Sequence, residues 1–258
     1  MFNNDMIFVL DKDYDLNINY KNEKVNLPWS IKEKIQKNWE ENGEKFTNGD
    51  IFYINRYDIN ESDKTIKMDI CNSTYDHYLY TRLKKEYDEY SCVNLWSGAV
   101  LETADKKLVL GRMSFQTVCE GELHISGGST DKKDLNGKTI DCKKTKVREL
   151  YEEMGIDIND KNVVKDYFIK YLKLPSIKEV ELSFGILYKI NLNITFEELE
   201  SNFNKYIKYL KDNVLEVEFT KIYGIDKTKK GIEEAKEKYG NRIPAYTIEL
   251  FLKECEEN

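Results

Sequence analysis

The amino-acid sequence predicts an α/β (α+β) protein, because strand-like and helix-like patterns both occur along its 258 residues. Residues 50–59 and 64–70 alternate apolar and polar side chains with the two-residue period of a half-buried strand. Ile31, Ile35 and Trp39 recur instead at the spacing of one helix face. Hydrophobic residues make up 40% of the chain and aromatic residues 12%, which is sufficient for a packed core.

The first ninety residues predict a helix, a β-hairpin and a second helix, in that order. A helix is expected behind Pro28 and Ser30, and the two alternating segments form a hairpin around residues 60–63. Ser73 or Thr74 is expected to cap a tyrosine-rich helix that continues to about Tyr87.

The pattern changes from Leu95 onwards, where a second hairpin is expected around a polar turn at residues 104–107. Gly111-Arg112 ends its second strand. The later strands are expected at residues 167–172, 180–190 and 214–223, and the later helices at 196–210, 232–238 and 244–253. No Pro/Gly-rich linker interrupts the chain, so we expect an α+β extension, residues 1–92, to pack on a second domain, residues 93–258.

Charge and cysteine content exclude several classes of protein. A net charge of −7 with acids and bases intermixed argues against a nucleic-acid binder, which needs a basic face. The five cysteines are odd in number and form no Cys-x-x-Cys pair, so neither a zinc site nor a disulfide framework is expected. No apolar run approaches the ~20 residues of a membrane span, and the N-terminus lacks a signal-peptide pattern. These observations predict a cytoplasmic protein with no membrane partner, and they leave its oligomeric state open.

Three carboxylates on one helix face are the main chemical feature of the chain. Glu149, Glu152 and Glu153 stand at i, i+3 and i+4, so they share about one helical turn. Like charges at this spacing destabilise a helix, and no lysine is interleaved at i+4 to offset them. Clustered carboxylate oxygens are the ligands that Mg²⁺ or Mn²⁺ prefers, which predicts a divalent-metal site.

The same helix has a predicted beginning, core face and end. Asp141 is expected to be its N-cap, and Leu150 and Met154 are expected to dock it on a core. Gly155 is expected to end it in the left-handed conformation. The polar run from Thr130 to Thr139 before it is expected to be a surface loop.

The stretch from Gly127 to Ile156 resembles the signature of Nudix hydrolases, Gly-x5-Glu-x7-Arg-Glu-U-x-Glu-Glu-x-Gly-U, where U is aliphatic. The second half matches at Arg148, Glu149, Leu150, Glu152, Glu153, Gly155 and Ile156. Gly128 and Arg148 stand 20 positions apart, whereas the family pattern has 14, and Ile140 occupies the place of the family's first glutamate.

This resemblance implies a Nudix α/β/α sandwich with a mixed β-sheet and a metal-dependent enzyme that hydrolyses a diphosphate linkage in a nucleoside diphosphate linked to another moiety. By the same resemblance, Arg148 orients Glu149, and Glu149 is a metal ligand or a base. Glu152, Glu153 and the Gly127 carbonyl bind Mg²⁺ or Mn²⁺. Gly128 contacts the nucleotide-type substrate.

A narrower resemblance connects the first half of the chain with the UDP-glucose and UDP-galactose pyrophosphatases. It depends on the Asn48-Gly49 hairpin and on Thr74-Tyr75-Asp76-His77-Tyr78. It implies a nucleotide-sugar substrate, and an ADP-ribose-type pyrophosphatase is the alternative enzyme. A Nudix fold that binds nucleotides without turnover is the alternative outside enzymes, since the first glutamate is missing.

Residues outside the motif provide further candidates. Glu218 is the expected extra catalytic acid, with Glu216 as its rival, and Glu179 and Glu181 carry the same ambiguity. Arg112 could clamp a phosphate, and a solvated arginine is the alternative. His124 and His77 are expected to be packed side chains without a catalytic role.

Overall fold

The computed structural model describes residues 6–10, 14–84, 88–176 and 182–256, and the chain divides into two compact units. Unit 1 comprises residues 1–97, 129–145 and 172–186, and unit 2 comprises residues 98–128, 146–171 and 187–258. Neither unit is one continuous stretch of sequence. The domain boundary between residues 92 and 93 remains a prediction.

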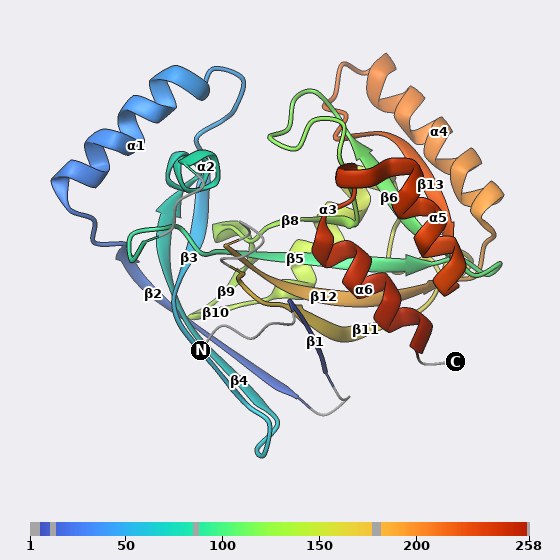
Figure 1. Cartoon of the computed structure of the whole chain (residues 1–258), viewed down its shortest axis with the longest axis horizontal. Coiled ribbons are helices and arrows are strands. Elements are labelled where there is room, and N and C mark those ends of the chain that lie inside the picture. Colours follow the sequence, from blue (N-terminus) through green and yellow to red (C-terminus); the bar gives the residue numbers. More distant parts are fainter. Residues whose placement is uncertain (1–5, 11–13, 85–87, 177–181, 257–258) are drawn as a thin grey trace. The chain divides into compact units, whose positions relative to one another are not determined.

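Unit 1 contains a mixed sheet made by β2 (Asp15–Lys24), β3 (Asp50–Asn60) and β4 (Thr65–Thr74), which lie side by side in Figure 1. β3 and β4 form the predicted antiparallel hairpin, and β2 runs parallel to β4. Ile66, Met68 and Ile70 alternate into the core with at most 2% exposure, as the two-residue period of β4 requires. β2 was not predicted, because Ile18 is the one residue of that strand that is buried.

The two helices of unit 1 are α1 (Trp29–Asn42) and α2 (Tyr75–Lys84). α1 begins directly after Pro28 and buries Ile31 and Ile35, as the sequence predicts. The start of α2 differs from the expectation, because its first backbone N–H groups donate to Gly49 and Asn48 in a distant loop. The predicted continuation of this helix to Tyr87 lies outside the described residues.

The polar run at residues 130–139 is a structured segment, and the prediction of a plain surface loop is wrong. It contains a 3₁₀ turn (η1, Lys132–Asp134) and two short strands, β9 (Leu135–Asn136) and β10 (Thr139–Ile140). Asp134 is 2% exposed, and its side chain accepts a hydrogen bond from the Asp131 N–H. β10 also pairs with β2, so the segment extends the sheet of unit 1.

Unit 2 contains an antiparallel strand pair, β6 (Lys107–Met113) with β13 (Phe219–Asp226). β7 (Leu123–His124) also pairs with β6. β13 begins five residues later than the sequence predicts. The residues before it belong to a turn in which Val214 has a φ of 58° and the Leu215 N–H donates to the Leu210 carbonyl.

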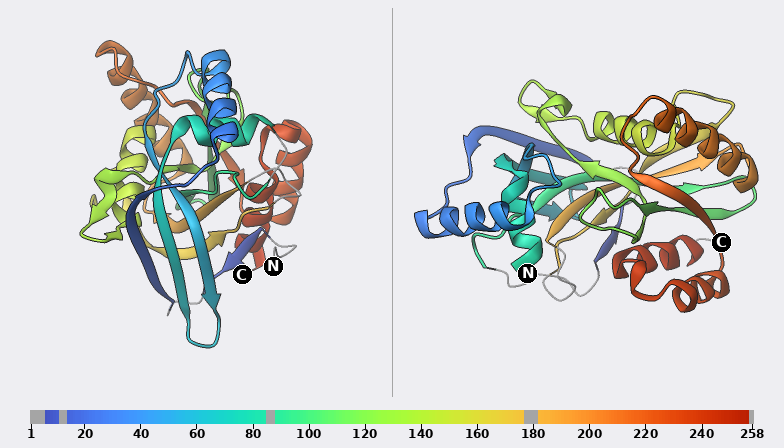
Figure 2. Two further views of the ribbon diagram at one scale, coloured as in Figure 1. Left: turned by 90° about the vertical axis from the view of Figure 1, so that its left-hand side faces the viewer. Right: turned by 90° about the horizontal axis from the view of Figure 1, so that it is seen from above.

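Three helices of unit 2 follow the predicted order: α4 (Phe196–Asp212), α5 (Lys229–Tyr239) and α6 (Ala245–Glu256). α4 begins with a reciprocal capping box between Thr195 and Glu198, and it buries one apolar face. α5 and α6 pack on each other (Figure 2).

The remaining elements complete the mixed α/β fold that the sequence predicts. They are β1 (Ile7–Val9), β5 (Asn94–Glu102), β8 (Ser126–Ser129), α3 (Cys142–Met154), β11 (Val164–Lys173), β12 (Ser183–Leu192) and η2 (Gly240–Arg242). The first two residues of the strand predicted at 180–190 lie outside the described residues. Within the described residues, no helix combines the length and the apolarity that a membrane crossing requires.

A buried ionic network fastens α6 inside unit 2. The Glu254 carboxylate is fully buried and accepts hydrogen bonds from Lys189 at 2.5 Å, Tyr171 at 2.7 Å and Lys170 at 3.1 Å. Lys189 also donates to Glu102 at 2.7 Å. Each buried charge has a close partner of opposite sign, which offsets the large cost of removing it from water.

Candidate functional site

The motif helix α3 has the beginning, core face and end that the sequence predicts. The Asp141 carboxylate accepts a hydrogen bond from the Lys143 N–H at 3.1 Å, as an N-cap does. Leu150 and Met154 are buried on the core side. Gly155 has a φ of +69°, the left-handed conformation that ends the helix.

The carboxylates of Glu149, Glu152 and Glu218 converge, with one oxygen from each lying within 4.8 Å of the others. Two of these residues come from α3, whereas Glu218 immediately precedes β13, 69 positions after Glu149 (218 − 149). A hydrogen bond of 2.8 Å from the Ser114 N–H to the Glu218 carbonyl fixes the backbone there. Of the two rivals proposed from sequence, Glu216 is exposed and is not in this group.

Glu153 lies on the same helix but has a different partner. Its carboxylate is 1% exposed and accepts a hydrogen bond of 2.9 Å from the Gly127 N–H. Gly128 lies against Glu149, because a Cβ atom added to Gly128 would be 2.4 Å from both carboxylate oxygens. Both glycines therefore line the cluster through their backbone, and the Gly127 carbonyl remains a predicted metal ligand.

Arg148 bridges two acids of the cluster. Its Nη1 donates to Glu149 at 2.6 Å and lies 3.4 Å from Glu152. The orienting contact with Glu149 and the i+4 ion pair with Glu152 therefore occur together.

Sequence reasoning missed Lys146 and Ser126. Lys146 precedes Glu149 by three residues and Glu153 by seven, so it shares their helix face, and its helical spacing could have revealed it. The Lys146 side chain is fully buried, and its Nζ donates to the Ser126 hydroxyl at 2.9 Å. No lysine stands four residues after any of the three acids, as the sequence analysis states, but Lys146 places a positive charge on the same face from the preceding turn.

Burial and mutual repulsion raise the pKa values of the acids. The pKa of Glu218 rises to about 7, chiefly through burial and then through Glu149, Glu216 and Glu152. Burial likewise raises the pKa of Glu149 and, together with Glu218, raises that of Glu153 far more. Burial also lowers the pKa of Lys146 to about 8, against the attraction of Glu153 and Glu149.

This donor set fits a divalent cation. Carboxylate oxygens are the ligands that Mg²⁺ and Mn²⁺ prefer, and Glu149, Glu152 and Glu218 place three of them within reach of one ion. A cation there would also offset the repulsion that raises the pKa values of the buried acids.

The other residues predicted from sequence are not members of this cluster or lie outside the described residues. Arg112 is an exposed residue of β6 opposite Lys221 of β13. His77 is 2% exposed and held by Ser73 at 2.9 Å and the Tyr90 carbonyl at 2.7 Å, as a packed histidine would be. Glu179 and Glu181 lie outside the described residues.

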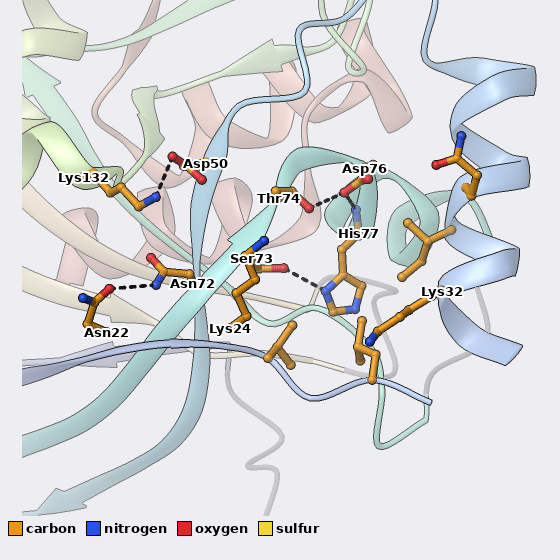
Figure 3. A pocket seen from close by; sticks show the side chains of 14 residues that line it. Asn22, Lys24, Lys32, Asp50, Asn72, Ser73, Thr74, Asp76, His77 and Lys132 are labelled. Atoms are coloured by element: carbon orange, nitrogen blue, oxygen red, sulfur yellow. Dashed lines mark hydrogen bonds and ion pairs between the residues drawn. The ribbon is translucent and has the colours of Figure 1, made fainter. Parts of the chain in front are cut away.

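Unit 1 contains a separate cavity of about 580 Å³ beside β4 and α2 (Figure 3). Lys24 and Lys32 line it together with apolar residues, and Lys132 pairs with Asp50 at its edge, 2.9 Å apart. Its volume is that of a small-molecule site.

No family model matches the chain, and no curated protein matches it. Solved structures with partial similarity include a Deinococcus radiodurans protein, 14% identical, with a TM-score of 0.43 over 62% of this chain and 82% of that one. A Nudix hydrolase from Nitrosomonas europaea is 12% identical, with a TM-score of 0.38 over 64% and 88% of the two chains. A MutT protein from Methanosarcina mazei Go1 is 15% identical, with a TM-score of 0.39 over 64% and 95%. These values are too low to carry an argument, so the functional case depends on the residues of the cluster.

Proposed function

We propose that this protein is a Nudix hydrolase that uses a divalent metal ion to hydrolyse a diphosphate linkage in a nucleoside diphosphate linked to another moiety. The convergence of Glu149, Glu152 and Glu218 carries this proposal. The resemblance of residues 148–156 to the Nudix signature supplies the reaction class.

The residues of the cluster have different proposed roles in such a reaction. Hydrolysis needs a water molecule placed in line with phosphorus, and a bound Mg²⁺ or Mn²⁺ supplies a Lewis acid and a more acidic water. Arg148 holds the Glu149 carboxylate in place, and the Gly127 N–H holds Glu153. Burial raises the pKa of Glu218 to about 7, which suits a general base near neutral pH, so Glu218 is the proposed base and Glu149 is the alternative.

The substrate class proposed here is a nucleotide-type small molecule. UDP-sugars are the first candidates because of the narrower resemblance in the first half of the chain, and ADP-ribose is the second. We propose that residues 1–92 are required for the protein to discriminate between UDP-sugars and ADP-ribose.

A binding module without turnover is the second candidate function. Ile140, 6% exposed, occupies the position of the family's first glutamate, so the chain lacks one acid of the signature. Lys146 adds a positive charge to the cluster and would compete with a cation for the same carboxylates. Both features favour a site that binds nucleotides more effectively than it hydrolyses them.

The test is hydrolysis of a panel of UDP-glucose, UDP-galactose and ADP-ribose by the full chain, with Mg²⁺, with Mn²⁺ and with EDTA. Release of a nucleoside monophosphate is measured by a coupled phosphatase assay. We expect metal-dependent turnover that falls by about 100-fold or more in Glu152→Gln and Glu153→Gln, because each replaces a carboxylate with an amide, which is a weaker metal ligand.

Glu216→Gln is the matched control, since Glu216 is an exposed acid two residues from Glu218 and outside the cluster. Its activity should remain close to that of the unmodified protein. Full activity of the Glu152→Gln/Glu153→Gln double variant at saturating Mg²⁺ would contradict the site assignment. Metal-dependent nucleotide binding by calorimetry without any turnover would select the binding module.

A further inference from the structure

We propose that Cys119, Glu122 and His124 form a second metal site in unit 2, specific for Zn²⁺ and distinct from the carboxylate cluster. One ligand atom from each residue lies within 4.8 Å of the other two. All three residues come from the short segment that connects β6 with β7 and continues into β7. The absence of Cys-x-x-Cys pairs predicts no zinc site, whereas the spacing that brings these ligands together is Cys-x2-Glu-x-His.

The ligand types select the ion. A thiolate, an imidazole nitrogen and a carboxylate oxygen together suit Zn²⁺, whereas Mg²⁺ prefers oxygen ligands alone. Three protein ligands leave the fourth tetrahedral position for water or another small ligand. The carboxylate cluster offers oxygen atoms only, so the two sites differ in the metal that each prefers.

The spacing is close to that of a tetrahedral site. Ligand atoms on zinc at ~2.1 Å bond length are roughly 3.4 Å apart. The Glu122 oxygen and His124 Nε2 are 2.8 Å apart, and the remaining separations are at most 4.8 Å. Shifts of about 0.5–1.5 Å therefore suffice, and half-buried side chains in a connecting segment can make them by rotamer changes.

The surroundings of His124 provide an independent indication. The buried Tyr246 hydroxyl lies 3.5 Å from His124 Nδ1, on the ring nitrogen opposite Nε2. A hydrogen bond at the second ring nitrogen of a metal-binding histidine fixes the orientation of the ring, and the Tyr246 hydroxyl lies at the outer limit of that distance. Tyr246 stands at the start of α6, so the site would connect this helix with the β6–β7 segment.

The segment that carries the proposed zinc ligands is hydrogen-bonded to the backbone of Glu218, a member of the carboxylate cluster. Two backbone hydrogen bonds close the segment: the Met113 N–H donates to the Glu122 carbonyl, and the Gly121 N–H donates to the Met113 carbonyl. The N–H of its first residue, Ser114, donates to the Glu218 carbonyl. A zinc ion would cross-link the far end of the segment. We therefore assign the ion a positioning role toward Glu218 and a contribution to the stability of unit 2.

Cobalt spectroscopy of the full chain tests the proposal. Protein stripped of metal with EDTA is titrated with Co²⁺, and the expected result is a thiolate-to-cobalt charge-transfer band that saturates at one ion per chain and disappears on addition of Zn²⁺. Cys119→Ser should abolish the band, and His124→Gln should weaken Co²⁺ binding by tenfold or more. Cys255→Ser is the matched control, because Cys255 is also a half-exposed free thiol, and it should leave the band unchanged.

A labelling experiment on the unmodified chain tests the proposal without any substituted protein, so its result does not depend on whether the variants fold. Zn²⁺ should slow iodoacetamide alkylation of Cys119 by tenfold or more and leave the rate at Cys255 unchanged, as read by peptide mass spectrometry. Zn²⁺ should also raise the thermal midpoint of the unmodified protein, and of a Glu149→Gln/Glu152→Gln variant by the same amount. Absence of the cobalt band, a band that survives in Cys119→Ser, or equal protection of both thiols would overturn the proposal.

Discussion

Replacement of Glu218 by Gln should stabilise the metal-free protein above neutral pH while it removes catalysis. Glu218 is half-buried among Glu149, Glu152 and Glu216, and its pKa is raised from 4.5 to about 7. A group with a raised pKa binds its proton more tightly in the folded state than in the unfolded state. Its stabilising contribution is therefore fully present below pH 4.5 and is lost as the pH rises through about 7.

The magnitude follows from the same two values. A rise from 4.5 to about 7, at about 1.36 kcal/mol per pKa unit, gives an upper bound of about 3.4 kcal/mol at pH 8.5. Residual solvent exposure screens the charges, so we expect about 1–2 kcal/mol. A neutral Gln keeps the shape of the side chain and removes the ionised carboxylate.

The assay is urea unfolding in EDTA at pH 5.0 and pH 8.5, with Glu216→Gln as the control. Glu218→Gln should unfold at a higher urea concentration than the unmodified protein at pH 8.5, and the difference should shrink at pH 5.0. Saturating Mg²⁺ should reduce the advantage of the variant, because the cation stabilises the protein that retains Glu218. Equal destabilisation of Glu218→Gln at both pH values would refute this account of the cluster.

Three further predictions concern stability and the shape of the site. Glu254→Ala should lower the free energy of unfolding by about 3–5 kcal/mol in urea titrations, because it removes the buried carboxylate to which Lys170, Lys189 and Tyr171 donate. Glu237→Ala on the exposed face of α5 should change it by less than about 0.5 kcal/mol. Gly128→Ala should lower kcat for the best substrate of the panel by about 10-fold or more, since the new Cβ would displace the Glu149 carboxylate. The circular dichroism spectrum should remain unchanged. An unchanged kcat would refute the proposed role of the Glu149 carboxylate in the reaction. Deletion of residues 133–138 should lower the thermal midpoint, because it removes the buried Asp134 and the β9–β10 pair, and an unchanged midpoint would restore the surface-loop interpretation.

The sequence by itself determined the features that depend on neighbours along the chain. The spacing of Glu149, Glu152 and Glu153, the Asp141 cap and the Gly155 end follow from helix geometry, so α3 was predicted with its correct faces. The β3–β4 hairpin was likewise predicted from a two-residue alternation. Local periodicity and capping act over a few residues, which is the range that a sequence pattern reports.

Tertiary structure alone decided which distant groups share a site. Glu216 and Glu218 carry the same local signal, and the register of β13 against β6 places only Glu218 with the acids of α3. The contact between the Tyr246 hydroxyl of α6 and His124 could not be predicted from a local sequence pattern either. Such contacts depend on chain paths and on burial, which set the charge and pKa of each group, and no short stretch of sequence encodes them.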